Sequence, residues 1–144
     1  MHPYPHLYEA TAEGTATAEV LVEAQGLPMI TTTPPPQFDG PPGNWSPETL
    51  LCASLADCLI LTFRAIARAS KFEWLRLRCR VEGTLERVEN TARFTRFVSH
   101  VTLVVPAGTD ADRARMLLEK SEHGCLIANS LLAKREIEAQ IISA

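Results

Sequence analysis

The sequence predicts an α+β fold in which antiparallel sheets surround one long buried central helix, with two shorter helices near the carboxyl end. Three observations support this prediction. A helical pattern runs without interruption from Ser46 to Arg68, apolar and charged residues alternate strictly over Leu75–Val81, and helix start and stop signals fall near residues 108 and 124. Strands come first, then the long helix, then strands, helices and a last strand, which is an α+β order.

The chain of 144 residues is most simply a single domain, residues 1–144, because one core of this size buries enough surface. Its net charge of -3 argues against a nucleic-acid partner, since phosphate binding needs an excess of Lys and Arg. All 14 basic residues lie at or after Arg64. The first residues lack the basic and apolar regions of a secretory signal, so we expect a cytoplasmic protein with reduced cysteines.

Three short strands open the chain in the prediction. Tyr8–Ala12, Thr15–Glu23 and Leu27–Thr33 are rich in Thr, Ala and Val and are separated by glycine-containing turns, which indicates an antiparallel meander. Residues 34–45 then contain five prolines and two glycines, so they form neither a regular helix nor a central strand. We expect the two aromatic residues of this segment, Phe38 and Trp45, to pack against the domain.

The long helix has a strong start. Ser46 is a capping residue, Pro47 suits the first helical position, and Glu48 places negative charge at the positive end of the helix dipole. From Leu50 to Phe63, Asp57 is the only ionisable residue besides cysteine. We therefore expect other elements to cover the helix on nearly all sides. Its uncharged part is shorter than about 18 residues, which argues against a membrane span.

The second half of the chain alternates strands and helices. We expect a hairpin that turns at Glu89-Asn90, a helix that begins after Gly108-Thr109-Asp110, and a break in that helix at Gly124-Cys125. The expected elements are strands at 75–88 and 93–105, helices ending near Glu122 and spanning Leu126–Ala133, and a final strand over Ile137–Ile141.

The four cysteines have different settings. Cys79 belongs to the apolar face of its strand and is expected to be a buried, inert thiol. Cys52 and Cys58 are six residues apart on one helix, about 9 Å along its axis, so they cannot form a disulfide. Cys125 follows Gly124 at the helix break, where free N–H groups favour a thiolate, and His123 is a possible helper. A buried Cys58 thiolate is disfavoured unless positive charge reaches it.

Three stretches resemble the OsmC/Ohr family of thiol-dependent hydroperoxide reductases. They are Ser46-Pro47-Glu48-Thr49-Leu50-Leu51, Leu55-Ala56-Asp57-Cys58, and His123-Gly124-Cys125-Leu126-Ile127-Ala128-Asn129-Ser130-Leu131. The resemblance extends from the proline-rich segment to the end of the chain. It implies that Cys58 attacks the peroxide and becomes a sulfenic acid, that Cys125 then forms a disulfide with it, and that an external dithiol or thiol reductant reopens the disulfide. It implies no resident cofactor and no metal.

The resemblance also implies an intertwined homodimer with the two long helices at its centre and Glu48 as an active-site glutamate. Because Glu48 lies about 15 Å from Cys58 along the helix, the glutamate of one site should come from the partner chain. The substrate is expected to be a small apolar hydroperoxide. We expect its pocket to be lined by Leu51, Leu55, Phe63 and Trp45.

One feature of the family pattern is missing. Members of the family have an arginine in the amino-terminal strands, and this chain has no Arg or Lys there. Arg64 and Arg68, which follow Cys58 on the helix, are the candidate substitutes. The missing cation leaves alternatives to a peroxidase open: a catalytically weak dimer that binds a small hydrophobic ligand, or a thiol redox sensor.

Overall fold

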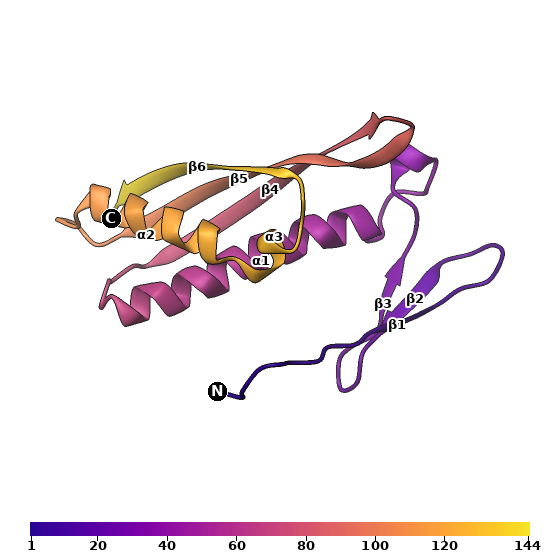
Figure 1. Ribbon diagram of the computed structural model, residues 1–144, viewed down its shortest axis with the longest axis horizontal. Helices are drawn as coiled ribbons and strands as arrows, with labels where there is room; N and C mark the ends of the chain where they lie inside the picture. Colours follow the sequence, from indigo (N-terminus) through magenta and orange to yellow (C-terminus); the bar gives the residue numbers. More distant parts are fainter. The chain divides into compact units, whose positions relative to one another are not determined.

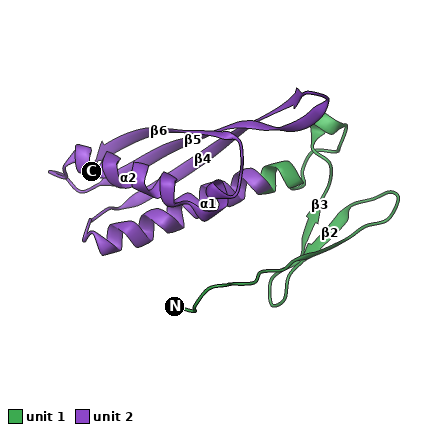
Figure 2. Ribbon diagram, viewed as in Figure 1, with its two compact units in different colours: residues 1–50 green, residues 51–144 purple.

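The computed structural model describes residues 1–144 and divides them into two compact units, residues 1–50 and 51–144 (Figure 2). Each unit contains a three-stranded sheet, and the helix α1 begins in the first unit and continues into the second. The α+β character is confirmed. The expectation of a single domain over residues 1–144 stays a prediction.

The sheet of the first unit is the expected antiparallel meander. Strands β1 (Thr11–Glu13), β2 (Val20–Glu23) and β3 (Ile30–Thr32) pair in chain order. All three strands are shorter than the sequence patterns suggested. The turn into β3 uses Gly26 at a positive φ of 74°, and Leu27 N–H donates to the carbonyl of Ala24 at 3.1 Å.

The proline-rich segment contains one short 3-10 helix, Pro36–Phe38, that ends at Asp39. The segment returns to the meander through its backbone, because Thr33 N–H donates to the carbonyl of Trp45 at 2.9 Å. The two aromatic side chains remain half exposed, Phe38 at 55% and Trp45 at 50%. The expectation that both pack against the domain is therefore wrong for this chain by itself, since backbone bonds rather than rings hold the segment.

The helix α1 spans Pro47–Ala69 and starts as predicted. The Oγ of Ser46 accepts from the N–H of Thr49 at 3.1 Å, and the hydroxyl of Thr49 accepts from the N–H of Ser46 at 2.9 Å. This reciprocal pair satisfies two backbone donors at the helix start. Glu48 lies in the first turn, where its charge favours the helix dipole.

Only one face of α1 is buried within the chain. Its core residues are Leu55, Leu59, Phe63 and Ala67, whereas Leu61 on the opposite side is 49% exposed. The expectation of cover on nearly all sides is wrong for the single chain. An 18-residue window of α1 has a mean hydropathy of 1.9, so its length and composition would suit a membrane span, contrary to the sequence argument. Packing rather than length identifies α1 as a core helix.

The sheet of the second unit contains β4 (Arg76–Val88), β5 (Thr91–Val105) and β6 (Lys134–Ser143) in that order. The β4–β5 hairpin is confirmed, and Glu89 and Asn90 at its turn both have positive φ. The strand β6 pairs parallel to β5, which corrects the expectation of purely antiparallel sheets. The connection from β5 to β6 passes through two helices (Figure 1). Parallel neighbours need such a crossover, because the chain must return to the end of the sheet at which β5 begins.

Two helices form that crossover. The helix α2 (Ala111–Gly124) is capped by Asp110, whose side chain accepts from the N–H groups of Asp112 and Arg113, as the sequence predicted. The helix α3 spans only Leu126–Asn129, shorter than the expected Leu126–Ala133.

The main core lies between one face of the sheet and the helices α1 and α2 (Figure 1). Its buried members include Phe63 from α1, Leu103 from β5 and Leu118 from α2, all fully enclosed. A second, smaller cluster contains Leu55, Phe97, Cys125 and Ala128. This cluster fixes the corner between α2 and α3 against α1, so it sets the position of Cys125 relative to that helix.

Candidate functional site

The structure brings together the two cysteines that the sequence singled out. Cys58 lies near the middle of α1, and Cys125 lies at the corner where α2 ends and α3 begins. Cys58 packs against the small apolar cluster that contains Cys125, and each of the two thiols affects the pKa of the other. All four cysteines of the chain are free. Two reduced thiols in contact, one on a rigid helix and one at a corner, are the arrangement that disulfide formation needs.

The pKa of Cys58 lies below its ordinary value although no cation touches it. Burial alone would raise the pKa of this thiol, but hydrogen bonds outweigh that effect. The backbone N–H of Ile127 is the largest of them, followed by the thiol of Cys125, the hydroxyl of Thr62 and the N–H of Leu126. Two of these donors belong to the first turn of α3. The expectation that Cys58 needs a positive side chain to favour its thiolate is therefore wrong.

The pKa of Cys125 is shifted in the opposite direction, above its ordinary value. Burial and, to a smaller extent, the contact with Cys58 raise the pKa of its thiol to about 11, although the N–H groups of Ala128 and Ile127 act the other way. The sequence predicted that the start of the short helix would favour a thiolate at Cys125. Donors from that helix do lower the pKa of Cys125, but burial outweighs them. The N–H groups of Leu126 and Ile127 also lower the pKa of Cys58, and there they prevail over burial.

The remaining two cysteines are structural. Burial raises the pKa of Cys79 to about 11 on the inner face of β4, and burial also raises the pKa of Cys52. Both observations agree with inert thiols. No group of three or more His, Cys, Asp and Glu side chains converges in a way that would hold a metal ion.

An apolar pocket of about 530 Å³ adjoins Cys58 on the exposed side of α1. Asp57 is its only charged residue, and Leu126 at its edge is 67% exposed. The pocket is lined by Ser54, Asp57, Cys58, Leu61, Thr62, Ala65, Gly124, Leu126 and Ile127.

None of the four residues expected to line the substrate pocket lies in this one. Leu55 lines a small cavity behind Cys125, and Leu51 lines a separate apolar hollow with Phe94, Phe97 and Leu131. Phe63 is fully buried in the core, where its ring packs edge-on against Phe72 and Trp74. Trp45 belongs to the first unit. The helix face that carries Cys58 therefore differs from the face to which the sequence assigned the pocket.

The predicted supporting residues do not contact the thiols within the chain. Arg64 and Arg68 are exposed and take part in no ion pair, and His123 is exposed with its Nδ1 2.8 Å from the carbonyl oxygen of Glu119. Glu48 lies in the first turn of α1, and its Oε2 is buried without a hydrogen-bond partner. An unpaired buried carboxylate oxygen is costly, so it calls for a partner that the single chain does not provide.

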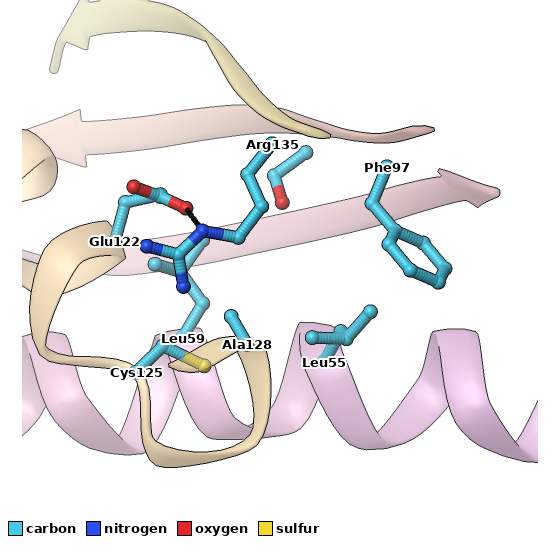
Figure 3. A pocket seen from close by; sticks show the side chains of 8 residues that line it. Leu55, Leu59, Phe97, Glu122, Cys125, Ala128 and Arg135 are labelled. Carbon is cyan, nitrogen blue, oxygen red and sulfur yellow. Dashed lines mark ion pairs between the residues drawn. The ribbon is translucent and has the colours of Figure 1, made fainter. Parts of the chain in front are cut away.

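Sequence reasoning missed an ion pair next to Cys125. The Nε of Arg135 lies 3.0 Å from Oε1 of Glu122, and both side chains are largely buried, at 24% and 14% exposure. Figure 3 shows the Arg135 side chain extending from β6 toward Glu122, above Cys125. The signal was present, because alternation along β6 places Arg135 on the same face as the apolar Ile137, Ala139 and Ile141.

The fold and the thiol pair define a class before any comparison is made: an α+β protein whose central helix presents one cysteine to another at a helix–helix corner. Residues 40–141 match the family of OsmC-like proteins, and the chain belongs to that family.

Similar proteins agree with this assignment. The chain is 23% identical over 109 residues to the uncharacterized protein YmaD of Bacillus subtilis, covering 74% of this chain and 73% of YmaD. An OsmC-like protein of unknown function from Vibrio cholerae superposes with a TM-score of 0.85 at 18% identity, covering 94% and 100% of the two chains. An organic hydroperoxide resistance protein from Legionella pneumophila superposes with a TM-score of 0.75 at 21% identity, covering 96% and 99%. At these identities the structural likeness shows the fold.

Proposed function

We propose that this protein reduces organic hydroperoxides with Cys58 as the nucleophile and Cys125 as the resolving thiol. The observation that carries the proposal is the packing of Cys58 against the cluster that contains Cys125, beside an apolar pocket. The pKa of Cys58 is lowered and that of Cys125 is raised. One thiol is therefore the better nucleophile, while the other stays protonated until it is needed.

The reaction follows from these two states. The Cys58 thiolate attacks the terminal oxygen of ROOH, the O–O bond breaks, and the alkoxide takes a proton to leave as ROH while Cys58 becomes a sulfenic acid. The sulfur of Cys125 then displaces hydroxide from the sulfenic acid, which leaves as water after taking the thiol proton, and a disulfide forms. An external dithiol or thiol reductant exchanges with this disulfide and restores both thiols. No resident cofactor is required.

The pocket supports a small apolar substrate. Leu61, Ala65, Leu126 and Ile127 supply most of its apolar lining around the Cys58 thiol, and an alkyl or aryl group would bury against them. Asp57 is the one charged residue in the lining, and its carboxylate would repel an anionic hydroperoxide. Neutral hydroperoxides such as cumene hydroperoxide are therefore the substrate class we propose.

We also propose that the working protein is a homodimer. The exposed face of α1 carries Leu61, and Leu126 and Ile127 on α3 extend the same apolar surface. Such a surface marks an interaction site in a monomer of this size. A second copy that covers it would exclude water from Cys58, and the partner's Glu48 is the proposed glutamate of the site. The unpaired Oε2 of Glu48 supports such a contact.

The test is peroxide consumption by purified, reduced protein. With cumene hydroperoxide and dithiothreitol, the wild type should turn over and Cys58→Ser should consume peroxide only at the background rate. With cumene hydroperoxide alone, Cys125→Ser should consume one equivalent and retain a Cys58 sulfenic acid, whereas the wild type should consume one equivalent and form the disulfide. Cys79→Ser is the matched control, because that thiol is remote from the pair, and it should retain wild-type turnover. Consumption by Cys58→Ser at the wild-type rate would refute the assignment.

The apolar pocket also favours a second candidate function, the binding of a small hydrophobic ligand by a catalytically weak dimer. In that case peroxide turnover would be slow in the wild type, and neutral apolar ligands would raise its melting temperature. A stoichiometric oxidation without turnover would instead identify a redox sensor. The same preparation and assay therefore separate the three functions.

A further inference from the structure

A network of side chains encloses the corner that carries Cys125. Arg135 on β6 contacts Glu122, three residues before Cys125, and its Nη1 donates to Oδ1 of Asn129, four residues after Cys125, at 2.8 Å. The Nδ2 of Asn129 donates in turn to the carbonyl of His123 at 3.1 Å. One guanidinium therefore joins the end of α2 to the end of α3, with Cys125 between them.

Besides this network, the corner is held by the small apolar cluster around Cys125 and by single backbone hydrogen bonds on either side of that residue. The helix α3 has only four residues, and such a short helix is marginal without outside support. Behind Cys125 lies a cavity of about 20 Å³, room for about one water molecule, with Glu122 and Arg135 among its lining residues (Figure 3). The thiol of Cys125 can therefore shift toward this cavity, away from Cys58, unless the surrounding contacts hold it in place.

We propose that the network of Glu122, Asn129 and Arg135, here called the corner clamp, positions the thiol of Cys125 and the N–H groups of Leu126 and Ile127 against Cys58. This inference rests on the proposed thiol reaction and adds positioning residues to it. Arg135 suits the role because its planar fork donates in two directions at once, which a lysine ammonium on a flexible stem does not reproduce. Arg135 contacts neither the substrate nor a sulfur atom. It affects the reaction by holding Glu122 and Asn129, and with them Cys125, in place.

The clamp would act on both steps of the reaction. Leu126 and Ile127 donate to Cys58, so a displaced corner weakens the hydrogen bonds that favour its thiolate. A displaced Cys125 would also meet the Cys58 sulfenic acid in the wrong geometry. Asp57 in the pocket lining and Cys125 at the corner are the titratable groups next to Cys58, and neither is altered in the variants below, whereas Glu122 and Arg135 line the cavity behind Cys125 and His123 is exposed.

The test uses thiol chemistry that does not need a peroxide. The rate of Cys58 alkylation by iodoacetamide is measured against pH, and the rate of disulfide formation is measured with diamide. In Arg135→Met the alkylation profile should move to higher pH, and disulfide formation should slow about 10- to 100-fold, the loss expected from a misplacement of about 1 Å. Arg135→Lys should recover only part of either rate.

Two further variants separate positioning from folding. Arg96→Met breaks a two-bond ion pair with Glu136, next to Arg135 on β6, that joins β5 to β6 on the exposed side of the sheet, and it should leave both thiol rates unchanged. The double variant Glu122→Leu with Arg135→Met removes both buried charges, so it should fold well and still show both thiol defects. Wild-type rates in the double variant would overturn the proposal. If the clamp variants show these defects while peroxide is not reduced by the wild type, the proposed function fails and the clamp stands.

Discussion

Cys58 packs against the cluster that contains Cys125, yet the surroundings of the two thiols change their pKa values in opposite directions. Cys58 is half-buried on α1 and receives N–H donors from α3, which lower its pKa. Cys125 is buried in the small apolar cluster with Leu55 and Phe97, and burial raises its pKa to about 11. Cys125 directly precedes α3, yet the N–H groups of α3 favour the thiolate of Cys58 more than that of Cys125.

The comparison shows how a thiolate can be favoured in a half of the chain without any positive side chain before Arg64. Backbone N–H groups supply partial positive charge wherever a helix begins, and their position is set by the fold rather than by residue type. A sequence search for a cation therefore looks for the wrong group. The cost is that the site depends on the exact placement of a four-residue helix.

The largest expected effect is the difference in reactivity between the two thiols. The pKa of Cys58 is lowered from its ordinary value and that of Cys125 is raised to about 11, and only the thiolate reacts with iodoacetamide, forming as the pH rises toward each pKa. At pH 8 Cys58 should be labelled about 100-fold faster than Cys125 or more. Peptide mass spectrometry after a short pulse of reagent measures the ratio. Equal labelling of the two cysteines would show that their surroundings do not shift their pKa values in opposite directions.

A methyl group at Gly83 should disturb the cluster around Cys125. A Cβ there would lie 2.9 Å from ring atoms of both Phe94 and Phe97, and 3.1 Å from the sulfur of Cys52. Because Phe97 packs in the cluster with Cys125, we expect Gly83→Ala to lower the free energy of unfolding by about 1–3 kcal/mol. Urea denaturation measures this change.

Gly124→Ala is the matched control for that prediction. Its added Cβ would meet only a methyl carbon of Thr62 at 3.5 Å, which is an ordinary contact. It should leave the urea midpoint close to that of the wild type. A Gly83→Ala variant as stable as Gly124→Ala would show that the cluster around Cys125 is loosely packed.

The smallest expected effect comes from the hydroxyl of Thr62, which lies 3.9 Å from the sulfur of Cys58 one turn earlier on α1. Thr62→Val removes this donor at nearly constant volume, so the pKa of Cys58 should rise and alkylation at pH 7 should slow about 2- to 10-fold. Thr62→Ser keeps the hydroxyl and should retain most of the wild-type rate. If the Val and Ser variants react alike, the N–H groups of α3 alone favour the thiolate.

Much of the fold could be predicted from the sequence because local signals and packing agree. The cap at Ser46, the hairpin turn at Glu89-Asn90 and the apolar face of Val101, Leu103 and Val105 all stand where the patterns placed them. The parallel pairing of β6 was missed, since alternation identifies a strand but not its partner. The exposed face of α1 was missed because apolar composition does not say whether elements of the same chain cover a helix face.

Of the candidate site, the sequence indicated the two cysteines of the pair but neither the residues that line the pocket nor the electrostatics of the thiols. Cys58 and Cys125 were identified from motif and position, and the structure places them in contact. The clamp residues Glu122 and Arg135 are 13 positions apart on different elements, and only the fold brings their charges together. The same holds for the N–H groups of α3, which no residue type reveals.

The central claim is that Cys58 and Cys125 form one redox pair, and the most direct test is to map the disulfide after oxidation. Reduced protein is treated with one equivalent of cumene hydroperoxide, digested without reductant and analysed by mass spectrometry. The account predicts a single peptide pair joined through Cys58 and Cys125, with Cys52 and Cys79 still free. A disulfide that includes Cys52 or Cys79, or four free thiols after the peroxide has been consumed, would contradict it.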